Sequence, residues 1–226
     1  MRLNGVQAAR VSTVLFDLDG TLVDSAPDLA GTANDLLQRR GRARLPYLDL
    51  RPHAGSGARG MLGVAFGLAP GDAGYEALRD EFHDHYVTRM LQETRPFDAA
   101  MRVLRALDRH GLPWGIVTNK ALRFAGPVVE AFGLQRSAVL VAGDSTPHTK
   151  PHPAPLLEAA RRLGCAPASC VYVGDDPRDV LAGRAAGMRT AAAAWGYLGM
   201  GLAPEAWGAD AVLPDADALL HWLELP

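Results

Sequence analysis

The chain has 226 residues, enough for one large domain or two modest ones with a buried core. Its composition, with 48% hydrophobic and 21% charged residues and a formal net charge of -2, is that of an ordinary globular protein. Lys and Arg (23) are slightly outnumbered by Asp and Glu (25), which argues against a phosphate-backbone binder, so no nucleic-acid partner is expected.

The apolar segments of the chain give no sign of export or of membrane insertion. The start, MRLNGVQAARVSTVLFDLDG, has no apolar core of signal-peptide length, so secretion is not expected. The stretch TAAAAWGYLGMGLA, from Thr190 on, is too short and too rich in glycine for a membrane span and is predicted to be a buried strand and loop. Two cysteines, Cys165 and Cys170, are too few for a disulfide framework or a zinc site. We expect a cytoplasmic protein without a membrane partner, and make no prediction of its oligomeric state.

Short runs rich in valine and isoleucine alternate with segments of helical period along most of the chain. This alternation is typical of parallel strands joined by crossover helices. The expected fold class is α/β, a doubly wound, Rossmann-like core with a parallel sheet of five or six strands. The predicted strands are residues 11–17, 114–118, 138–143 and 169–176, with weaker signals at 189–194 and 210–214.

One stretch, from about Ser25 to Met90, breaks the alternation because it carries only helical patterns. Ser25 is the predicted N-cap of a first helix that ends at Gly41, and a later helix has apolar residues from Tyr75 to Met90 on one face. The segment HAGSGARGML (53–62) is predicted to be a glycine-rich loop that approaches a ligand closely. We therefore expect a small all-helical cap inserted in the core. The predicted domains are a core of residues 1–24 and 91–226 and a cap of residues 25–90.

Polar side chains follow the predicted strands at their carboxyl ends, where ligands of open α/β sheets bind. The first strand runs into Asp17 and Asp19 in FDLDGT, another ends at Thr118, and a third runs into Asp175, while Lys150 precedes a predicted helix. Asp and Gly are also common turn formers after strands. The agreement among several strand ends favours a site that handles a phosphoryl group.

Carboxylates gathered at one sheet edge need a positive partner. Two of them about 4 Å apart repel by roughly 4 kcal/mol at an effective dielectric of about 20, and a phosphate dianion adds to the repulsion. Oxygen ligands without clustered His or Cys favour a hard ion such as Mg²⁺. The sequence therefore predicts a magnesium site.

This ordered set of motifs resembles the haloacid dehalogenase superfamily of aspartate-nucleophile phosphotransferases. DLDGT corresponds to the first motif, Thr118 to the second, Lys150 to the third and GDDPRD (174–179) to the fourth. The resemblance extends over nearly the whole chain after residue 10. It implies that Asp17 attacks phosphorus, and that Asp19 protonates the leaving oxygen and then activates water.

The resemblance also implies the ligands of the metal ion. Asp17, the backbone carbonyl of Asp19 and Asp175 would hold Mg²⁺, with Asp176 or Asp179 in support.

Other residues are expected to hold the substrate. Thr118 and Lys150 would bind the phosphoryl oxygens. Asn119 is a further substrate-binding candidate, and Arg59 is another, although it is equally well explained as a solvated arginine at a helix end. The positions expected to discriminate between substrates are Ser56, Arg59, Asn119, Lys120 and Arg123.

Several longer sequence segments resemble one branch of the superfamily. KPHPAPLLEAA, YVGDDPRD and WGY are similar to phosphoglycolate phosphatases, and WGIVTNKALRFA and WGADAVL to N-acetylmuramic acid 6-phosphate phosphatases. The implied partner is a small phosphorylated metabolite. The resemblance implies a Mg²⁺-dependent phosphatase that forms an aspartyl-phosphate, phosphoglycolate phosphatase-like first and an N-acetylmuramic acid 6-phosphate phosphatase second. A phosphoglucomutase-like phosphotransferase and a catalytically silent regulatory module on the same fold remain as alternatives.

Overall fold

A six-stranded parallel sheet forms the centre of the molecule, in the order β5-β4-β1-β6-β7-β8. The computed structural model describes residues 11–225, so residues 1–10, on which the expectation of no signal peptide partly rests, lie outside the described residues. The strands are β1 (Thr13–Phe16), β4 (Trp114–Val117), β5 (Leu140–Val141), β6 (Cys170–Gly174), β7 (Arg189–Ala193) and β8 (Ala211–Leu213). The doubly wound α/β fold and its six strands are confirmed.

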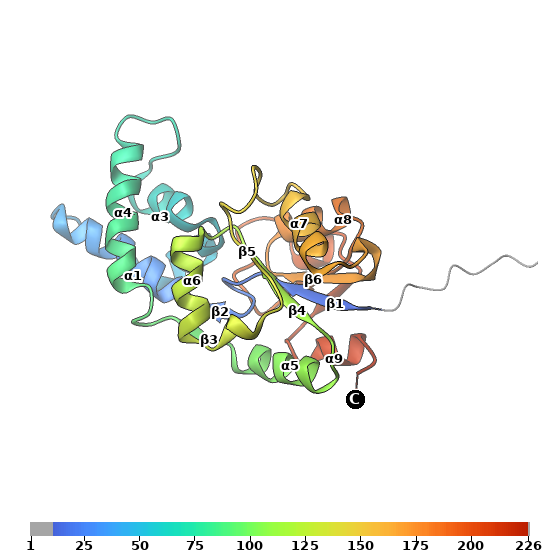
Figure 1. Cartoon of the computed structure of the whole chain (residues 1–226). Coiled ribbons are helices and arrows are strands. Elements are labelled where there is room, and N and C mark those ends of the chain that lie inside the picture. Colours follow the sequence, from blue (N-terminus) through green and yellow to red (C-terminus); the bar gives the residue numbers. More distant parts are fainter. Residues whose placement is uncertain (1–10, 226) are drawn as a thin grey trace, which may run out of the picture.

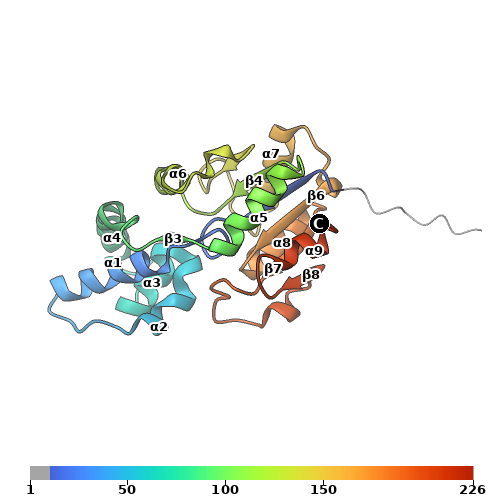
Figure 2. The same ribbon diagram turned by 90° about the horizontal axis from the view of Figure 1, so that it is seen from below.

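Helices cover both faces of this sheet, as Figures 1 and 2 show. Along β1 the side chains alternate, so that Val14 and Phe16 face one helical layer and Leu15 the other. The first layer consists of α5 (Asp98–Arg109), α6 (Leu122–Ala131) and α9 (Ala218–Trp222). The second consists of α7 (Ala154–Leu163) and α8 (Pro177–Ala185). No helix within residues 11–225 is long and apolar enough to cross a membrane.

Residues 26–89, here called the helical insertion, lie to one side of the sheet in Figure 1. Its helices are α1 (Ala26–Arg39), α2 (Tyr47–Leu50), a 3-10 helix (Arg51–Ser56), α3 (Gly57–Phe66) and α4 (Tyr75–Arg89). They enclose an apolar cluster of their own, in which Leu36, Met61 and Phe82 are almost fully buried. The helix with an apolar face from Tyr75 onward is confirmed as α4.

For the insertion, one local prediction is wrong and another is confirmed in position. Residues 53–62 are not a loop but the end of the 3-10 helix and the start of α3, because Ala54, Met61 and Leu62 are buried at helical spacing. Ser25 does occupy the N-cap position of α1, but its side chain makes no capping hydrogen bond. Its hydroxyl instead donates to Asp19 at 2.5 Å, so the serine stands at the start of α1 and also contacts the site.

The chain enters and leaves the insertion at adjacent points. β2 (Val23–Asp24) pairs antiparallel with β3 (Arg95–Pro96). Beside this pair, the carboxylate of Asp28 in α1, which is fully buried, accepts hydrogen bonds from the backbone N–H groups of Glu93 and Thr94 and from the Thr94 hydroxyl. The returning segment is thereby fixed to the first turn of α1.

Candidate active site

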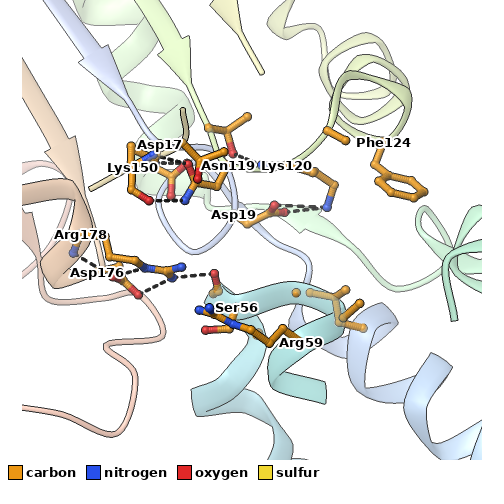
Figure 3. Close-up of a pocket in the computed structure, with 18 of the residues that line it drawn as sticks. Asp17, Asp19, Ser56, Arg59, Asn119, Lys120, Phe124, Lys150, Asp176 and Arg178 are labelled. Atoms are coloured by element: carbon orange, nitrogen blue, oxygen red, sulfur yellow. Dashed lines mark hydrogen bonds and ion pairs between the residues drawn. The ribbon is translucent and has the colours of Figure 1, made fainter. Parts of the chain in front are cut away.

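A cavity of about 580 Å³ lies between the carboxyl ends of the strands and the helical insertion (Figure 3). All the site residues predicted from the sequence line it, on one side or the other. They are Asp17, Asp19, Arg59, Thr118, Asn119, Lys150 and Asp175. Because the residues come from strand ends far apart in the sequence, the parallel sheet brings them together, as expected for this type of fold.

Lys150 is the central cation of the sheet side and is only 3% exposed. Its Nζ lies 3.0 Å from Oδ1 of Asp17 and 2.7 Å from Oδ1 of Asp179, and it donates to the Tyr172 hydroxyl at 2.7 Å. Burial disfavours the ammonium, but the two carboxylates outweigh this and raise the pKa of Lys150. The side chain therefore stays charged between the carboxylates of Asp17 and Asp179.

Asp17 follows β1 directly, and its Oδ1 accepts from the backbone N–H of Leu18 at 2.7 Å. Burial raises the pKa of Asp17 to about 6; Lys150 opposes this shift, while Asp179 and Asp19 add to it. The shift is thus caused first by burial of the carboxylate, and the neighbouring carboxylates add to it.

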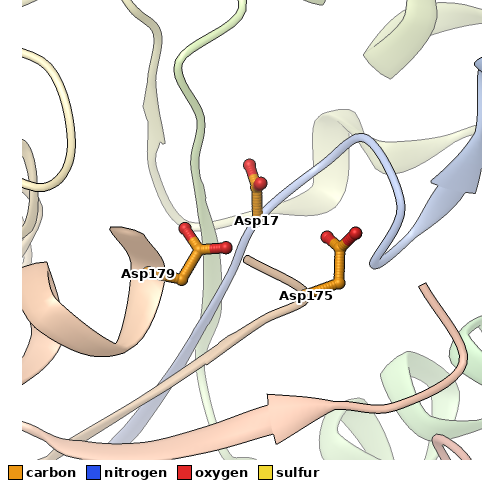
Figure 4. Close-up of side chains that lie close together, drawn as sticks. All are labelled: Asp17, Asp175 and Asp179. Carbon is orange, nitrogen blue, oxygen red and sulfur yellow. The ribbon is translucent and has the colours of Figure 1, made fainter. Parts of the chain in front are cut away.

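Three carboxylates offer ligand atoms within 4.8 Å of one another: those of Asp17, Asp175 and Asp179 (Figure 4). Asp176, the alternative to Asp179 in the sequence prediction, is directed elsewhere. It caps α8 and pairs with Arg178, with both its oxygens 2.7 Å from that guanidinium. The acidic group that could hold a metal ion thus includes Asp179 and excludes Asp176.

The side chain of Asp175 is fixed by hydrogen bonds and closely surrounded by backbone. Its Oδ1 accepts from the Thr21 hydroxyl at 2.9 Å and its Oδ2 from the backbone N–H of Tyr197 at 2.8 Å. A Cβ on Gly20 or on Gly196 would come within 2.1 Å of the Asp175 side chain, and Gly20 has a φ of 84°. Burial, Asp17 and Asp179 together raise the pKa of Asp175 well above its usual range. A bound cation would relieve this crowding, so the oxygen donors fit a hard metal ion.

Asp19 points to a different part of the cavity (Figure 3). Nζ of Lys120 lies 3.1 and 3.2 Å from its two oxygens, and the Ser25 hydroxyl donates to Oδ1. Lys120 also donates to the hydroxyl of Tyr86 on α4 at 2.8 Å. The carboxylate two residues beyond Asp17 is thus connected to the helical insertion through one lysine.

Thr118 and Asn119 follow β4 and have different surroundings. The Thr118 hydroxyl, at the cavity wall, accepts from the backbone N–H of Lys120 at 3.2 Å. The Asn119 side chain accepts from the backbone N–H of Lys150 at 2.9 Å and donates to its carbonyl at 3.0 Å. Asn119 therefore braces the loop that carries Lys150; its contact with substrate stays a prediction.

The insertion contributes Ser56 and Arg59, which lie across the cavity from Asp17 and Lys150 in Figure 3. Arg59 is exposed and has no ion pair within residues 11–225. Beside these residues, Arg178 of α8 donates to the carbonyl of Gly55 at 2.8 Å and so connects the core to the insertion.

The sequence did not predict the contacts of Lys120, Tyr86 and Arg178. Lys120 was recognised only as a position that discriminates between substrates, although its place in the polar run after β4 was a usable signal. Tyr86 was predicted as part of a buried helical stripe, which it is, but the pattern of apolar residues carries no information on its hydroxyl. Apart from the position of Arg178 inside GDDPRD, the sequence carries no indication of its contact with the insertion.

The comparisons with known proteins agree on one family. A family model described as haloacid dehalogenase-like hydrolase matches residues 11–187. A phosphoglycolate phosphatase of Xylella fastidiosa is 45% identical over 215 residues, which are 94% of this chain and 93% of that protein. An N-acetylmuramic acid 6-phosphate phosphatase of Pseudomonas putida is 42% identical over 208 residues, 90% of this chain and 92% of that protein.

A solved structure agrees with these relatives. The crystal structure of a predicted phosphoglycolate phosphatase from Haemophilus somnus superposes with a TM-score of 0.83 at 26% identity, covering 96% of this chain and 99% of that one. The resemblance found in the motifs is confirmed over nearly the full length of the chain. The chain belongs to the haloacid dehalogenase-like hydrolases, within a group of phosphatases.

Proposed function

We propose that this protein hydrolyses a small phosphomonoester through a covalent aspartyl-phosphate on Asp17. The observation that carries the proposal is the position of Asp17 at the end of β1, 3.0 Å from the buried ammonium of Lys150 and beside two further carboxylates. A nucleophile, a cation for the phosphoryl oxygens and a group of metal ligands thus meet in one cavity.

The reaction has two steps. In the first, a carboxylate oxygen of Asp17 bonds to phosphorus, the bond from phosphorus to the ester oxygen breaks, and Asp19 gives that oxygen a proton. In the second, Asp19 takes a proton from water, the water oxygen bonds to phosphorus, and Asp17 leaves as a free carboxylate. Thr118 and Lys150, both lining the cavity, bind the phosphoryl oxygens in each step.

Asp17, Asp175 and the backbone carbonyl of Asp19 would hold Mg²⁺, with Asp179 in support. The close approach of Gly20 and Gly196 to Asp175 supports this assignment, since it fixes that carboxylate toward Asp17. When bound, Mg²⁺ supplies positive charge that offsets the negative charge of the carboxylates and the phosphoryl group.

Residues 25–90 act as a cap over the site in this proposal, and the rest of the chain forms the core. The cap and core touch through Lys120 with Tyr86 and through Arg178 with the Gly55 carbonyl. A cap in this position would exclude bulk water from the aspartyl-phosphate until the leaving group has departed.

Two substrates are supported by the names of the relatives, 2-phosphoglycolate first and N-acetylmuramic acid 6-phosphate second. The size of the cavity favours the second, since about 580 Å³ lies in the range of pockets that enclose ligands much larger than a two-carbon acid. Arg59 is a proposed contact for the part of the substrate beyond the phosphate.

The test is a screen of the purified protein with Mg²⁺ against a panel of phosphorylated metabolites and p-nitrophenyl phosphate, comparing kcat/KM and measuring released phosphate. Asp17→Asn should abolish turnover while leaving the circular dichroism spectrum unchanged. Phosphate transferred to a sugar without release would favour a phosphotransferase instead. Absence of any turnover in the wild type would favour a silent regulatory module.

A further inference from the structure

Charge is distributed unevenly around the cavity. Every acidic residue that lines it within residues 11–225 comes from the loops after β1 and β6 or from the first turn of α8: Asp17, Asp19, Asp175, Asp176 and Asp179. On the opposite side, the lining includes the guanidinium groups of Arg59 and Arg79 from the insertion and of Arg123 from the start of α6. Since Arg79 pairs with two carboxylates, the guanidinium groups of that side without an ion pair are those of Arg59 and Arg123, and they attract a second negative group on any ligand whose phosphate lies at Lys150.

Arg123 is oriented by neighbours from both parts of the molecule. Its Nη2 donates to Nδ1 of His83 on α4 at 3.1 Å, and its guanidinium carbon lies 4.5 Å from the centre of the Phe124 ring. The His83 ring itself lies 5.3 Å from the Phe124 ring, between centroids. Burial lowers the pKa of His83, and so do Arg123 and Arg79, which keeps this histidine a neutral acceptor. The guanidinium of Arg123, although the residue is exposed, thus lies against the Phe124 ring and the His83 imidazole.

Within residues 11–225, Arg123 shares with Arg59 the absence of a carboxylate at ion-pair distance, although the Asp80 carboxylate interacts with Arg123 from farther away. Arg79 pairs with Glu76 and Asp80, and Arg178 pairs with Asp176. No carboxylate within residues 11–225 forms an ion pair with Arg123. A guanidinium that lines a cavity, is oriented by hydrogen bonding and stacking, and has no carboxylate at ion-pair distance is suited to a carboxylate from a ligand.

The space beside Arg123 suits a bulky ligand. Phe82, Tyr86 and Phe124 form a continuous aromatic wall, with ring centres 6.2 Å apart for Phe82 and Tyr86 and 5.5 Å apart for Tyr86 and Phe124. The cavity keeps about 580 Å³ although the insertion already touches the core through Tyr86 and Gly55. Aromatic rings pack well against the apolar face of a sugar ring.

We propose that Arg123, oriented by His83 and Phe124, binds a carboxylate of the substrate, and that the substrate is a sugar-sized phosphomonoester bearing that carboxylate. The inference rests on the proposed function, because it assumes that the phosphate of the same molecule lies at Asp17 and Lys150. The residues that select the substrate would then lie where α4 and α6 meet.

The test uses a matched pair of compounds. N-acetylmuramic acid 6-phosphate and N-acetylglucosamine 6-phosphate differ only in the lactyl ether that carries the carboxylate. We expect kcat/KM of the wild type to be at least about tenfold higher for the first, and Arg123→Gln to reduce this preference by about 10- to 100-fold. Arg123→Lys should keep part of it, because the charge remains but the planar fork is lost. Arg105→Gln, an exposed arginine of α5, is the control and should leave both rates unchanged.

Two further compounds separate the inference from the function on which it rests. Turnover of p-nitrophenyl phosphate measures phosphatase activity without any carboxylate, so its absence contradicts the proposed function itself. With that activity present, equal kcat/KM for the matched pair, an equal loss on both in Arg123→Gln, or 2-phosphoglycolate as the better substrate would each overturn the inference.

Discussion

Lys120 and Asp19 form a buried two-point ion pair in which Nζ lies 3.1 and 3.2 Å from the two carboxylate oxygens. The Lys120 side chain is 7% exposed and that of Asp19 15%. Burial disfavours the ammonium, but Asp19 and Tyr86 outweigh it and raise the pKa of Lys120, so the lysine remains charged. In the proposed mechanism this pair holds the acid/base group in place and makes its position depend on Tyr86, a residue of the insertion.

We predict that Lys120→Met lowers kcat by about 10- to 100-fold with a smaller change in KM, because the lysine acts through Asp19. Asp19→Asn should slow both steps of the reaction. Combined with Asp19→Asn, Lys120→Met should cause little further loss, since residues that act as a unit are not additive. Steady-state kinetics on the two single variants and the double variant measure this, and independent, multiplying effects would contradict it.

The contact between Gly20 and Asp175 leads to a second prediction. Gly20→Ala strains a backbone at φ 84° by about 1–2 kcal/mol and displaces the Asp175 carboxylate, which a Cβ would approach within 2.1 Å. We expect a loss of Mg²⁺ affinity of at least about tenfold together with a loss of activity.

Gly41→Ala is the matched control for Gly20→Ala. Gly41 also has a positive φ, of 67°, but a Cβ there meets no atom within 4 Å. It should lower the melting temperature to a similar extent and leave Mg²⁺ affinity and kcat unchanged. Equal effects of the two variants on Mg²⁺ affinity, measured by isothermal titration calorimetry, would show that the Asp175 contact has no part in metal binding.

Removal of the metal should have a pH-dependent effect on stability. The pKa of Asp17 is raised from 3.8 to about 6 in the folded protein, so the folded state binds a proton more tightly than the unfolded state. The contribution of this bound proton to the free energy of unfolding is therefore fully present below pH 3.8 and is lost as the pH rises through about 6. Asp175 acts in the same direction. At pH 7.5 the metal-free site is thus crowded with charge, which Mg²⁺ relieves.

We predict that a fixed Mg²⁺ concentration, about a hundredfold above the Kd at pH 7.5, raises the melting temperature by about 5–10 °C at pH 7.5 and by clearly less at pH 5, where the Kd is higher. Differential scanning fluorimetry with EDTA or MgCl₂ measures the shift. The melting temperature of the Asp175→Asn variant should change little on addition of Mg²⁺ at either pH. A shift that is the same at pH 5 and pH 7.5 in the wild type would contradict the assignment of these carboxylates.

Asp179 and Asp176 should respond differently to the same substitution. Asp179 lies 2.7 Å from Lys150 and belongs to the acidic group, so Asp179→Asn should lower kcat and Mg²⁺ affinity by at least about tenfold. Asp176 caps α8, and asparagine caps helices about as well, so Asp176→Asn should cost little stability and keep the metal affinity. The reverse order of effects in the same assays would reassign the metal support.

Much of the molecule was predictable because strand ends and motif residues are local signals. The sheet, the positions of its strands and the meeting of Asp17, Thr118, Lys150 and Asp175 at one edge all follow from alternating segments and parallel topology. The strands β2 and β3 were not predicted because each is only two residues long and is defined by its partner.

The local features that the sequence did not predict share a physical cause. In each case, contacts with residues far away in the sequence compete with the local pattern. Ser25 is the N-cap of α1 as predicted, but its hydroxyl donates to Asp19 and makes no capping hydrogen bond. The glycines of residues 53–62 indicate a loop, but burial of Met61 and Leu62 stabilises a helix there. Asp176 and Asp179 both belong to the capping box of α8, and only the fold shows that the Asp179 carboxylate also joins the acidic group.

The short ribbon of β2 and β3 has a consequence for how such enzymes diversify. Val23 pairs with Pro96 and Asp24 with Arg95, so the whole insertion leaves and rejoins the core at one place, and it contributes no strand to the six-stranded sheet. An insertion attached in this way can be lengthened, shortened or exchanged between relatives without altering the register of any strand in the sheet. Evolution, or a protein engineer, can change what the enzyme recognises while the chemistry stays where it is.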